Sequence, residues 1–412
     1  MRLAVVSPFL DRRHGTERCV VEQIERFLEK SDCEVHIYSQ AIQDFDVVCY
    51  SGTGGSSGVA RKAVWHRIPV LPGPYLTNFL WWYFANLALR WYHRKFRSLA
   101  YDLVFSPGIN CPDADAIVVH IVFHEFFRLV HGELRLRDAP FRTWPTVLHR
   151  ILYYRLIMAL ENLIYHNSRV SLAAVSSLTA REISSHFGRA DVTVIPNAVD
   201  LARFSLSERL RRRASARHAL NISETDFVLL LVGNDWKKKG LPCLLDAVAR
   251  VPQLPFRVLV VGRDDRATFL PRIHRLHLED RVVFVEPSPD IMQFYAAADV
   301  YAGPSLHDSF ALPPIEAMAC GLPVITTVNN GGSQVITDGL DGFVLEDPTD
   351  SATLAQLVER LHAQPDLRRR VGEAAARTAQ SYTWERNASE TWDFLCQALA
   401  RKASAVRKTS NQ

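Results

Sequence analysis

The stretch HDSFALPPIEAMACGLPV, residues 307–324, places two carboxylates, Asp308 and Glu316, on either side of a pair of prolines. Proline suits the first turn of a helix, where its missing N–H would have no partner, and the glycine and proline that close the stretch supply a stop. We therefore predict a short helix from Pro313 or Pro314 to Cys320.

The tip of this helix could bind an anion. Unpaired amides around Ala311 to Ile315, together with the helix dipole, favour a phosphate group there. Asp308 and Glu316 would repel that anion unless they accepted hydrogen bonds from hydroxyl groups. A nucleoside diphosphate sugar, with phosphates and two sets of hydroxyls, satisfies these demands. The alternative is that Asp308 is an ordinary loop acid and that Glu316 only complements the dipole.

Two more loops carry cations after apolar runs. The loop GNDWKKKG, 233–240, places three consecutive lysines at the end of a predicted strand, and Lys239 could reach a diphosphate. The loop VGRDD, 261–265, adds Arg263 after the next strand. The alternatives are a solvated lysine cluster and an ordinary turn.

Short apolar runs separated by helical patterns must position these loops. Such alternation predicts an α/β fold with mainly parallel sheets and helices on both faces, and ligands then lie beyond the carboxyl ends of the strands. The pattern ends and restarts around PNAVDLARFSL, so we place a hinge near 196–206. The first series of runs is 3–7, 34–38, 46–50, 102–105, 116–119, 172–176 and 192–195, and the second is 227–233, 257–262, 281–286, 299–303, 323–327 and 342–346.

The bulk composition fits an ordinary globular protein. A chain of 412 residues exceeds what one core usually supports, so two domains are expected. Its net charge of +4 gives no reason to expect a nucleic-acid partner. The 7 cysteines are scattered, without metal-binding spacing, which fits a reducing cytosol. The start, MRLAVVSPFL, is too short an apolar run for a secretory signal and predicts a first strand.

The segment from Tyr75 to Leu99 is aromatic and aliphatic with a basic end, and it lies in a stretch, 47–101, that contains no acidic residue. It is too short and too interrupted to span a bilayer comfortably. Its composition suits a helix lying in the plane of an anionic membrane interface. A buried helix with a solvated basic end is the equal alternative.

A series of motifs in register across most of the chain resembles the large family of retaining glycosyltransferases known as glycosyl transferases group 1, or family 4. The motifs are HGTERCVVEQIERF, AVSSLTAREI, VIPNAVDLARF, LLVGNDWKKKGLPCLLDAVA, VLVVGRDD, FYAAADVYAGPS, SFALPPIEAMACGLPVITT, GGSQVITDGLDGFV and YTWERNASETW. The resemblance implies the glycosyltransferase B fold, in which two Rossmann-like domains face each other across a cleft.

The resemblance also implies a division of labour along the chain. Residues 1–205 would form the acceptor-binding domain and residues 206–380 the nucleotide-sugar-binding domain. A helix at 381–402 would cross back to the first domain, and 403–412 would be a tail.

The family pattern assigns roles to several positions of this sequence. Lys239 would stabilise the donor diphosphate, Glu316 would hydrogen-bond the ribose hydroxyls, and Asp308 would touch the donor sugar. Gly15 would approach the donor phosphates or the acceptor. Gly233, Asn234, Lys238, Arg263, Phe310, Ala311 and Leu312 complete the expected donor site.

Some positions depart from the family pattern. His14 stands where the first of two glycines is usual, Asp308 is one methylene shorter than the usual glutamate, and Asn234 replaces an arginine. Lys237 or Lys238 could supply the missing charge. Gln334 stands where an acid is common, so we assign it no catalytic role.

The expected chemistry is transfer with retention, in which cations and helix-end amides stabilise charge on the leaving diphosphate. No cofactor and no obligatory metal are expected, although the pair Asp113 and Asp115 imitates a metal motif. Of the two histidines near the end of a predicted strand, we favour His120 over His124 as the catalytic one, and a buried structural imidazole is the alternative for either. The glycine-rich loop 51–58 lacks the third glycine of a dinucleotide fingerprint, so we interpret it as an acceptor-side or structural loop.

The expected function is a cytoplasmic glycosyltransferase, resting on the inner face of the membrane, that acts on a glycan or lipid-linked acceptor in cell-envelope polysaccharide or lipopolysaccharide assembly. The alternatives are a nucleotide-sugar epimerase on the same two-domain plan and a sugar-nucleotide-binding protein without catalysis. The sequence does not indicate the base, the sugar, the linkage or the oligomeric state.

Overall fold

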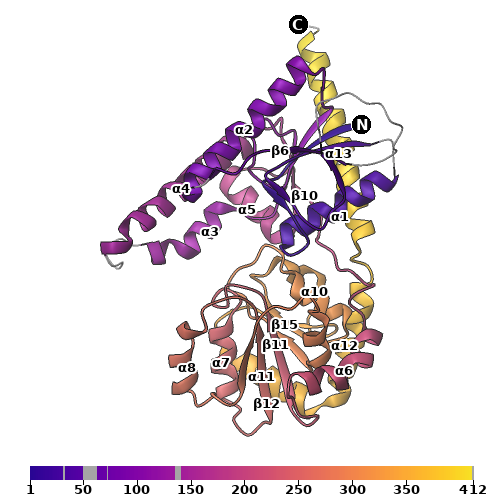
Figure 1. Ribbon diagram of the computed structural model, residues 1–412. Coiled ribbons are helices and arrows are strands. Elements are labelled where there is room, and N and C mark those ends of the chain that lie inside the picture. The colour runs from indigo at the N-terminus through magenta and orange to yellow at the C-terminus, as the bar shows by residue number, and fades with distance from the viewer. Residues whose placement is uncertain (31–32, 50–62, 72, 135–140, 411–412) are drawn as a thin grey trace. The chain divides into compact units, whose positions relative to one another are not determined.

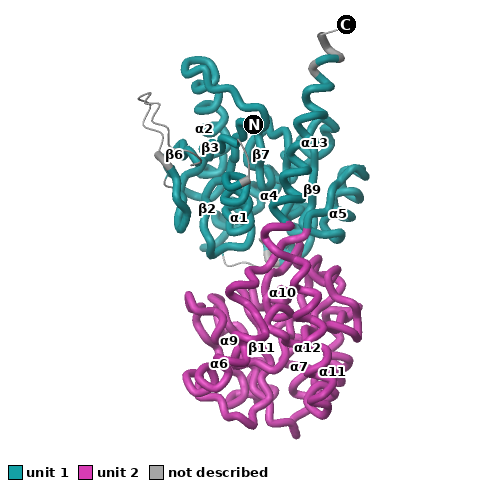
Figure 2. Tube along the Cα trace, turned by 90° about the vertical axis from the view of Figure 1, so that its right-hand side faces the viewer, with its two compact units in different colours: residues 1–195, 387–412 teal, residues 196–386 magenta. Residues whose placement is uncertain are grey.

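The computed structural model describes residues 1–30, 33–49, 63–71, 73–134 and 141–410. Its contacts divide the chain into two compact units, an N-terminal unit of Met1–Ile195 with Asn387–Gln412 and a C-terminal unit of Pro196–Arg386. Figure 2 colours the two units separately. Each unit contains a parallel sheet covered by helices (Figure 1), so the predicted fold class is confirmed.

The sheet of the N-terminal unit has eight strands in the order β10-β9-β8-β7-β1-β3-β6-β5. Helices α1 and α13 pack together through Phe27 and Trp392, and α2 packs on α4 through Phe79 and Tyr153. The strands are β1 Arg2–Val6, β3 Glu34–Ser39, β5 Val47–Cys49, β6 Ala63–Arg67, β7 Leu103–Ser106, β8 Ala116–Val119, β9 Ser171–Ala174 and β10 Thr193–Val194, with a separate small sheet of β2 Phe9–Leu10 and β4 Ala41–Ile42. The helices are α1 Gly15–Lys30, α2 Tyr75–Phe96, α3 Phe123–Val130, α4 Trp144–Tyr165, α5 Ser177–Phe187 and α13 Trp384–Ser410, with short 3-10 turns at His131–Leu134 and Phe141–Thr143.

The sheet of the C-terminal unit has six strands in the order β13-β12-β11-β14-β15-β16. Every residue of β11 is buried, as expected for a central strand of a parallel sheet covered on both faces. The strands are β11 Phe227–Val232, β12 Phe256–Val261, β13 Val282–Val285, β14 Val300–Ala302, β15 Val324–Thr327 and β16 Phe343–Leu345. The helices are α6 Leu206–Ala219, α7 Leu241–Ala249, α8 Leu270–Arg275, α9 Met292–Ala297, α10 Leu312–Ala319, α11 Ser351–Ala363 and α12 Pro365–Ala379, with 3-10 turns at Arg266–Thr268 and Gly331–Val335.

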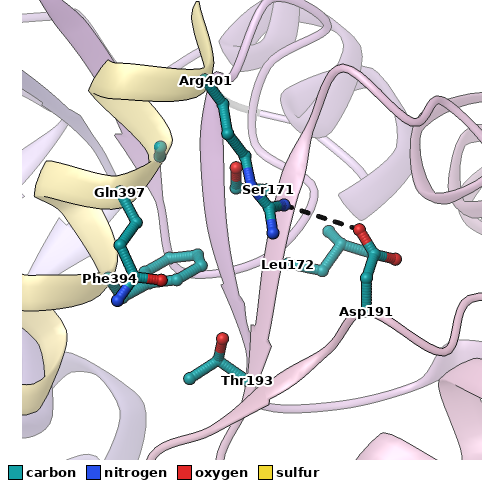
Figure 3. A pocket seen from close by; sticks show the side chains of 8 residues that line it. Ser171, Leu172, Asp191, Thr193, Phe394, Gln397 and Arg401 are labelled. Atoms are coloured by element: carbon teal, nitrogen blue, oxygen red, sulfur yellow. Dashed lines mark ion pairs between the residues drawn. The ribbon is translucent and has the colours of Figure 1, made fainter.

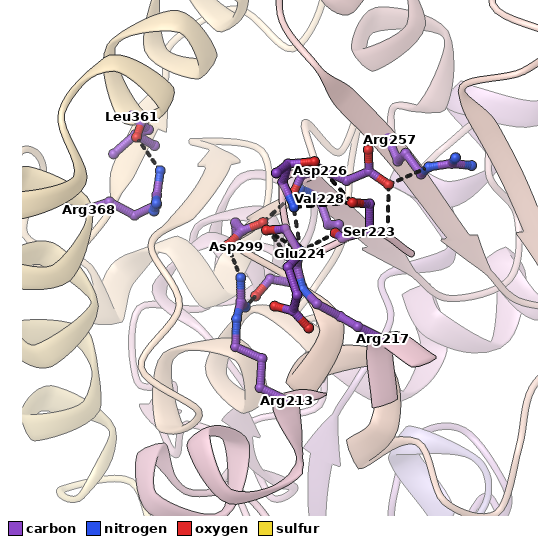
Figure 4. A network of polar contacts seen from close by, with 12 residues as sticks. Arg213, Arg217, Ser223, Glu224, Asp226, Val228, Arg257, Asp299, Leu361 and Arg368 are labelled. Atoms are coloured by element: carbon purple, nitrogen blue, oxygen red, sulfur yellow. Dashed lines mark hydrogen bonds and ion pairs between the residues drawn. The ribbon is translucent and has the colours of Figure 1, made fainter. Parts of the chain in front are cut away.

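A buried acid fixes the first helix of this unit to the sheet. Asp299, immediately before β14, accepts hydrogen bonds from Arg213 and Arg217 of α6 at 2.7 Å each, and from the amide of Val228 in β11 at 2.8 Å (Figure 4). Because loss of one partner would leave a buried charge uncompensated, this network holds α6 against the amino ends of β11 and β14. The arginines of the basic stretch 206–219 therefore include buried structural residues as well as solvated ones.

Candidate functional site

The order in which strands are added to the C-terminal sheet reverses between β11 and β14, which are parallel neighbours. From β11 it proceeds to β12 and β13 on one side, and it then returns to add β14, β15 and β16 on the other. The loops that follow β11 and β14 therefore start from adjacent strands at the switch point of the sheet, which is where open α/β sheets bind ligands. These loops are Gly233–Gly240 and Gly303–Ala311, two of the segments that the sequence singled out.

Gly240 joins the two loops. It has a φ of +86° and precedes α7, and a Cβ at this position would lie 2.0 Å from the carbonyl oxygen of Pro304. The amide of Leu306 also donates a hydrogen bond to the carbonyl oxygen of Lys238 at 2.7 Å. Because only glycine permits both the left-handed backbone and this close approach, the loops are held together directly beside Lys239.

Lys239 and Asp308 face each other across the ends of these strands. The Nζ of Lys239 lies 2.5 Å from Oδ2 of Asp308, and both side chains are largely buried. The lysine stem lies over Gly233, whose Cβ, if present, would be 3.0 Å from Cε of Lys239. The other oxygen of Asp308 accepts a hydrogen bond from the amide of Phe310 at 3.2 Å. The structure therefore brings together a cation and a carboxylate that are 69 positions apart in sequence.

Glu316 lies one turn inside α10 and is only 5% exposed. Its Oε2 accepts a hydrogen bond of 2.7 Å from the hydroxyl of Tyr295, a fully buried residue of α9. Burial and the charge of Glu316 hold the pKa of Tyr295 far above its ordinary value, so the hydroxyl remains a donor. The sequence analysis missed Tyr295, although it lies within the motif FYAAADVYAGPS.

The tip of α10 has fewer available donors than the sequence predicted. The helix begins at Leu312, one residue before the predicted start, and Pro313 and Pro314 occupy its first turn without N–H groups. The amide of Ala311 is not unpaired as predicted, because it donates to Oδ1 of Asn330 at 3.2 Å. Because Pro313 and Pro314 lack N–H groups, the amide of Leu312 is the first donor that this helix tip can offer.

Three other predicted donor residues take part in contacts of their own. Asn234 accepts a hydrogen bond from the amide of Arg263 at 2.8 Å, which connects the loops after β11 and β12. The side chain of Arg263 is well exposed and lies 3.5 Å from Glu286. Lys238 pairs with Asp235 at 2.6 Å, three positions earlier in its own loop. Asn234 thus fixes loop geometry and does not supply the charge of the arginine that it replaces.

Gly15 and His120 belong to the N-terminal unit. Gly15 is exposed and begins α1, and His14 before it is held by Asp11, whose Oδ2 lies 2.8 Å from Nδ1 of His14. Partial burial of Asp11 raises its pKa, but hydrogen bonds from His14 and Arg13 outweigh this effect and lower it overall. The turn that contains His14 is therefore stabilised by a side chain, where the family pattern has the first of two glycines.

His120 follows β8 directly and is buried, which lowers its pKa to about 4. It is therefore neutral at pH 7. His124 instead lies 2.6 Å from Glu161, a fully buried acid of α4 that also accepts hydrogen bonds from the amides of Phe123 and His124 at 2.7 and 3.1 Å. Burial raises the pKa of Glu161 to about 8. His124 is thus part of a cap on α3.

The remaining motifs show no ligand site in the described structure. Both oxygens of Asp113 accept hydrogen bonds from Arg90, and Asp115 pairs with Lys402. No cluster of three or more His, Cys, Asp or Glu side chains in the described ranges could hold a metal ion. The loop 51–58 lies outside the described residues.

One small cavity lies in the N-terminal unit, between α13 and the strands β9 and β10 (Figure 3). Its volume is about 10 Å³, and Arg401 and Asp191 pair at 3.6 Å beside it. Because this volume holds about one water molecule, it is no site for a nucleotide or a sugar. None of the described helices combines the length and the apolar character that crossing a bilayer requires.

Comparisons with known proteins agree with this arrangement. Residues 212–378 match the family described as glycosyl transferases group 1, and residues 14–203 match glycosyltransferase family 4. A D-inositol 3-phosphate glycosyltransferase of Pseudarthrobacter chlorophenolicus is 32% identical over 242 residues, 56% of each chain. One of the same name from Arthrobacter sp. is 34% identical over 232 residues, 53% of this chain and 54% of the relative. The chain thus spans about half the length of the curated relatives it matches.

Solved structures share the fold over nearly the whole chain at low sequence identity. WaaG, a glycosyltransferase involved in lipopolysaccharide biosynthesis, superposes with a TM-score of 0.73 at 20% identity, covering 95% of this chain and 98% of its own. Sucrose-phosphate synthase from Thermosynechococcus elongatus gives 0.72 at 19% identity, with 97% and 99% coverage. Anabaena Alr3699/HepE in complex with UDP-glucose gives 0.62 at 19% identity, with complete coverage of both chains, 100% each.

Two parallel α/β units, the second with an ion pair at its switch point, define the class of glycosyltransferase B folds. Both halves of the chain match sequence families of that class. The chain belongs to the glycosyl transferases group 1, as the motifs in its sequence indicated.

Proposed function

We propose that this protein is a retaining glycosyltransferase that transfers a sugar from a nucleoside diphosphate sugar to an acceptor hydroxyl. The observation that carries the proposal is the Lys239–Asp308 pair at the switch point of the C-terminal sheet, with the buried Glu316 inside the adjacent helix. The named glycosyltransferase relatives and the UDP-glucose complex of Alr3699/HepE support a nucleotide-sugar donor.

Each group at the switch point has a role in this reaction. The bond between the anomeric carbon and the diphosphate oxygen breaks, the acceptor oxygen bonds to the same face of that carbon, and the acceptor proton passes to the diphosphate. Lys239 and the amide of Leu312 stabilise the negative charge that develops on the diphosphate. Asp308 accepts a hydrogen bond from a hydroxyl of the donor sugar, and Glu316, positioned by Tyr295, accepts from the ribose hydroxyls.

The N-terminal unit contributes the acceptor side in this proposal. His120 is uncharged at pH 7, so its imidazole can accept or donate a hydrogen bond without adding a cation to the reaction. Gly15, at the exposed start of α1, permits close approach of a donor phosphate or an acceptor.

We place the acceptor among glycans or lipid-linked sugars of cell-envelope polysaccharide or lipopolysaccharide assembly. The involvement of WaaG in lipopolysaccharide biosynthesis supports this choice. The segment from Tyr75 to Leu99, with its basic end, supports a cytoplasmic protein that rests on the anionic inner face of the membrane.

A ligand panel followed by a transfer assay tests the function. Thermal shifts with UDP, GDP, ADP and their sugars should identify one base, because a ligand at a hundredfold excess over its dissociation constant stabilises the folded protein by about 2.7 kcal/mol. With a donor that carries this base, transfer of the sugar should depend on added acceptor. The new glycosidic linkage should keep the anomeric configuration of the donor. An epimerised donor formed without acceptor would identify an epimerase instead, and binding without turnover would identify a non-catalytic protein.

A further inference from the structure

Helix α2 buries three of its polar residues and exposes five of its aromatic residues. Asn86, Arg90 and His93 are buried, with exposed fractions of 0%, 4% and 5%. Five aromatic residues spaced at helical intervals lie on the opposite side and are between 41% and 60% exposed. They are Trp81, Phe84, Trp91, Tyr92 and Phe96, which we call the outer aromatic face. A helix that only covered a core would show the reverse pattern.

The buried polar residues fix the orientation of this helix. Nη1 and Nη2 of Arg90 each donate a hydrogen bond of 2.7 Å to Asp113, and Nη2 also donates to Oδ1 of Asn86 at 2.9 Å. Nδ1 of His93 lies 2.7 Å from the hydroxyl of Tyr38 in β3. Because rotating α2 would bury its aromatic residues only by breaking these buried contacts, the outer aromatic face stays exposed.

Cations lie on and beside this face, in a segment of the chain that has no acidic residue. Arg94 and Lys95 are exposed in the last turn of α2, and Nζ of Lys95 lies 5.0 Å from the ring centre of Trp91. The sequence from residue 47 to residue 101 contains no Asp or Glu. Positive side chains attract the phosphates of an anionic bilayer, and Trp and Tyr prefer to lie in its headgroup region. A surface that combines both complements such a bilayer.

Helix α4 extends the exposed apolar surface beside α2. The two helices are in contact, because the amide of Leu76 donates to Nε2 of His149 at 2.9 Å, and they run side by side in Figure 1. Trp144, Leu148 and Leu152 recur every four positions along α4 and are 40%, 48% and 48% exposed. Nothing in the amino-acid sequence had singled out α4 for this role.

We propose that α2 and α4 together form a membrane-docking surface, with the outer aromatic face of α2 inserted among the headgroups of an anionic bilayer and α4 widening the contact. This inference deepens the proposed function by assigning its membrane contact to particular side chains. The helices lie in the interface plane, and Arg94 and Lys95 contact lipid phosphates.

Vesicle flotation with the full-length protein tests this surface. Vesicles of phosphatidylcholine with phosphatidylglycerol should carry wild-type protein, and vesicles of phosphatidylcholine alone should carry at least tenfold less. The pair Phe84→Ala with Trp91→Ala should reduce flotation at least tenfold at low and high salt. The pair Arg94→Glu with Lys95→Glu should abolish it, and the pair Leu148→Ala with Leu152→Ala should give a smaller loss.

Matched controls come from the C-terminal unit. Leu210 and Leu340 are 58% and 61% exposed, and Arg275 and Arg370 are exposed cations. The pairs Leu210→Ala with Leu340→Ala, and Arg275→Glu with Arg370→Glu, should change flotation by less than twofold. Wild-type protein that ignores anionic vesicles, or controls that lose as much binding as the α2 variants, would overturn the proposal. So would a dimer in light scattering that the Phe84→Ala, Trp91→Ala pair dissociates.

Donor binding separates this inference from the proposed function. The same variants should keep the thermal shift that the best nucleoside diphosphate gives with wild-type protein. If no nucleotide binds but flotation follows the pattern above, the transferase proposal fails and the docking surface stands. If nucleotide binds but flotation fails, only the docking surface is lost.

Discussion

Replacing Lys239 by methionine removes a charge and keeps a side chain of similar length over Gly233. A charge-assisted hydrogen bond contributes about 1.5–3 kcal/mol, so the loss should weaken binding of a nucleoside diphosphate roughly 10- to 150-fold. In the wild type, however, the diphosphate competes with Asp308 for the same ammonium group. Both side chains keep some solvent contact, 16% and 21%, so this competition is worth only about 1 kcal/mol.

A double-mutant cycle makes that competition measurable. Asp308→Asn alone should bind the diphosphate about fivefold more tightly, because Lys239 is released, and yet it should slow sugar transfer because a contact to the sugar is weakened. The Lys239→Met penalty should be about 1 kcal/mol larger in the Asp308→Asn background than in the wild type.

Isothermal titration calorimetry at fixed salt, with the best-binding nucleoside diphosphate, measures all four proteins. The nucleoside without phosphates is the ligand control, and its affinity should not change in any variant. Lys237→Met removes a charge from an exposed position of the same loop and should cost less than twofold. If Lys239→Met binds the diphosphate as the wild type does, the assignment of this lysine to the diphosphate is refuted.

Three further predictions concern stability. Gly240→Ala would place a Cβ 2.0 Å from the Pro304 carbonyl oxygen, so it should lower the free energy of urea unfolding by about 2–4 kcal/mol. Gly339 has a similar positive φ but no atom within 4 Å, so Gly339→Ala should lower it by only about 1 kcal/mol. Equal losses would contradict the close approach at Gly240. His120 has a folded-state pKa of about 4 against an ordinary value of 6.5, so its contribution to stability is present above pH 6.5 and is lost as the pH falls toward 4. His120→Gln should therefore flatten the plot of melting temperature against pH between pH 4 and 6.5. An unchanged slope would count against a buried neutral imidazole. Glu161 has a folded-state pKa of about 8 against an ordinary value of 4.5, so its contribution to stability is present below pH 4.5 and is lost as the pH rises toward 8. Glu161→Gln should reduce the decline of the melting temperature over that range. A steeper decline in the variant would refute the assignment.

The strands could be predicted because a parallel sheet covered on both faces needs continuous apolar runs. The run 227–233 became β11 and the run 116–119 became β8 almost to the residue. The sequence analysis missed β6, Ala63–Arg67, because its His and Arg interrupt the apolar pattern. The same reasoning placed α10 nearly correctly, with its start displaced by one residue to Leu312.

The ion pair of the site could not be predicted, although both of its residues were. Lys239 and Asp308 meet because β14 lies next to β11, with β12 and β13 between them in sequence but not in space. Asn330 was missed for the same reason, since its contact with the amide of Ala311 depends on how two distant loops fold together. Spacing along a chain indicates chemistry, whereas strand order decides which groups meet.

Helix α2 is a further case in which sequence left two interpretations open. Its aromatic residues were visible, but which side of the helix would be buried depended on Asp113 and Tyr38, whose positions follow from the sheet. In the structure Trp82 and Tyr83 enter the core, whereas the outer aromatic face remains exposed.

The central claim is that a nucleoside diphosphate sugar binds between the loops that follow β11 and β14. A crystal of the protein soaked with the nucleotide that gives the largest thermal shift tests it most directly. Diphosphate density should lie within hydrogen-bonding distance of Nζ of Lys239 and the amide of Leu312, with the ribose against Glu316. Nucleotide density elsewhere in the molecule, with Lys239 still paired to Asp308, would contradict it.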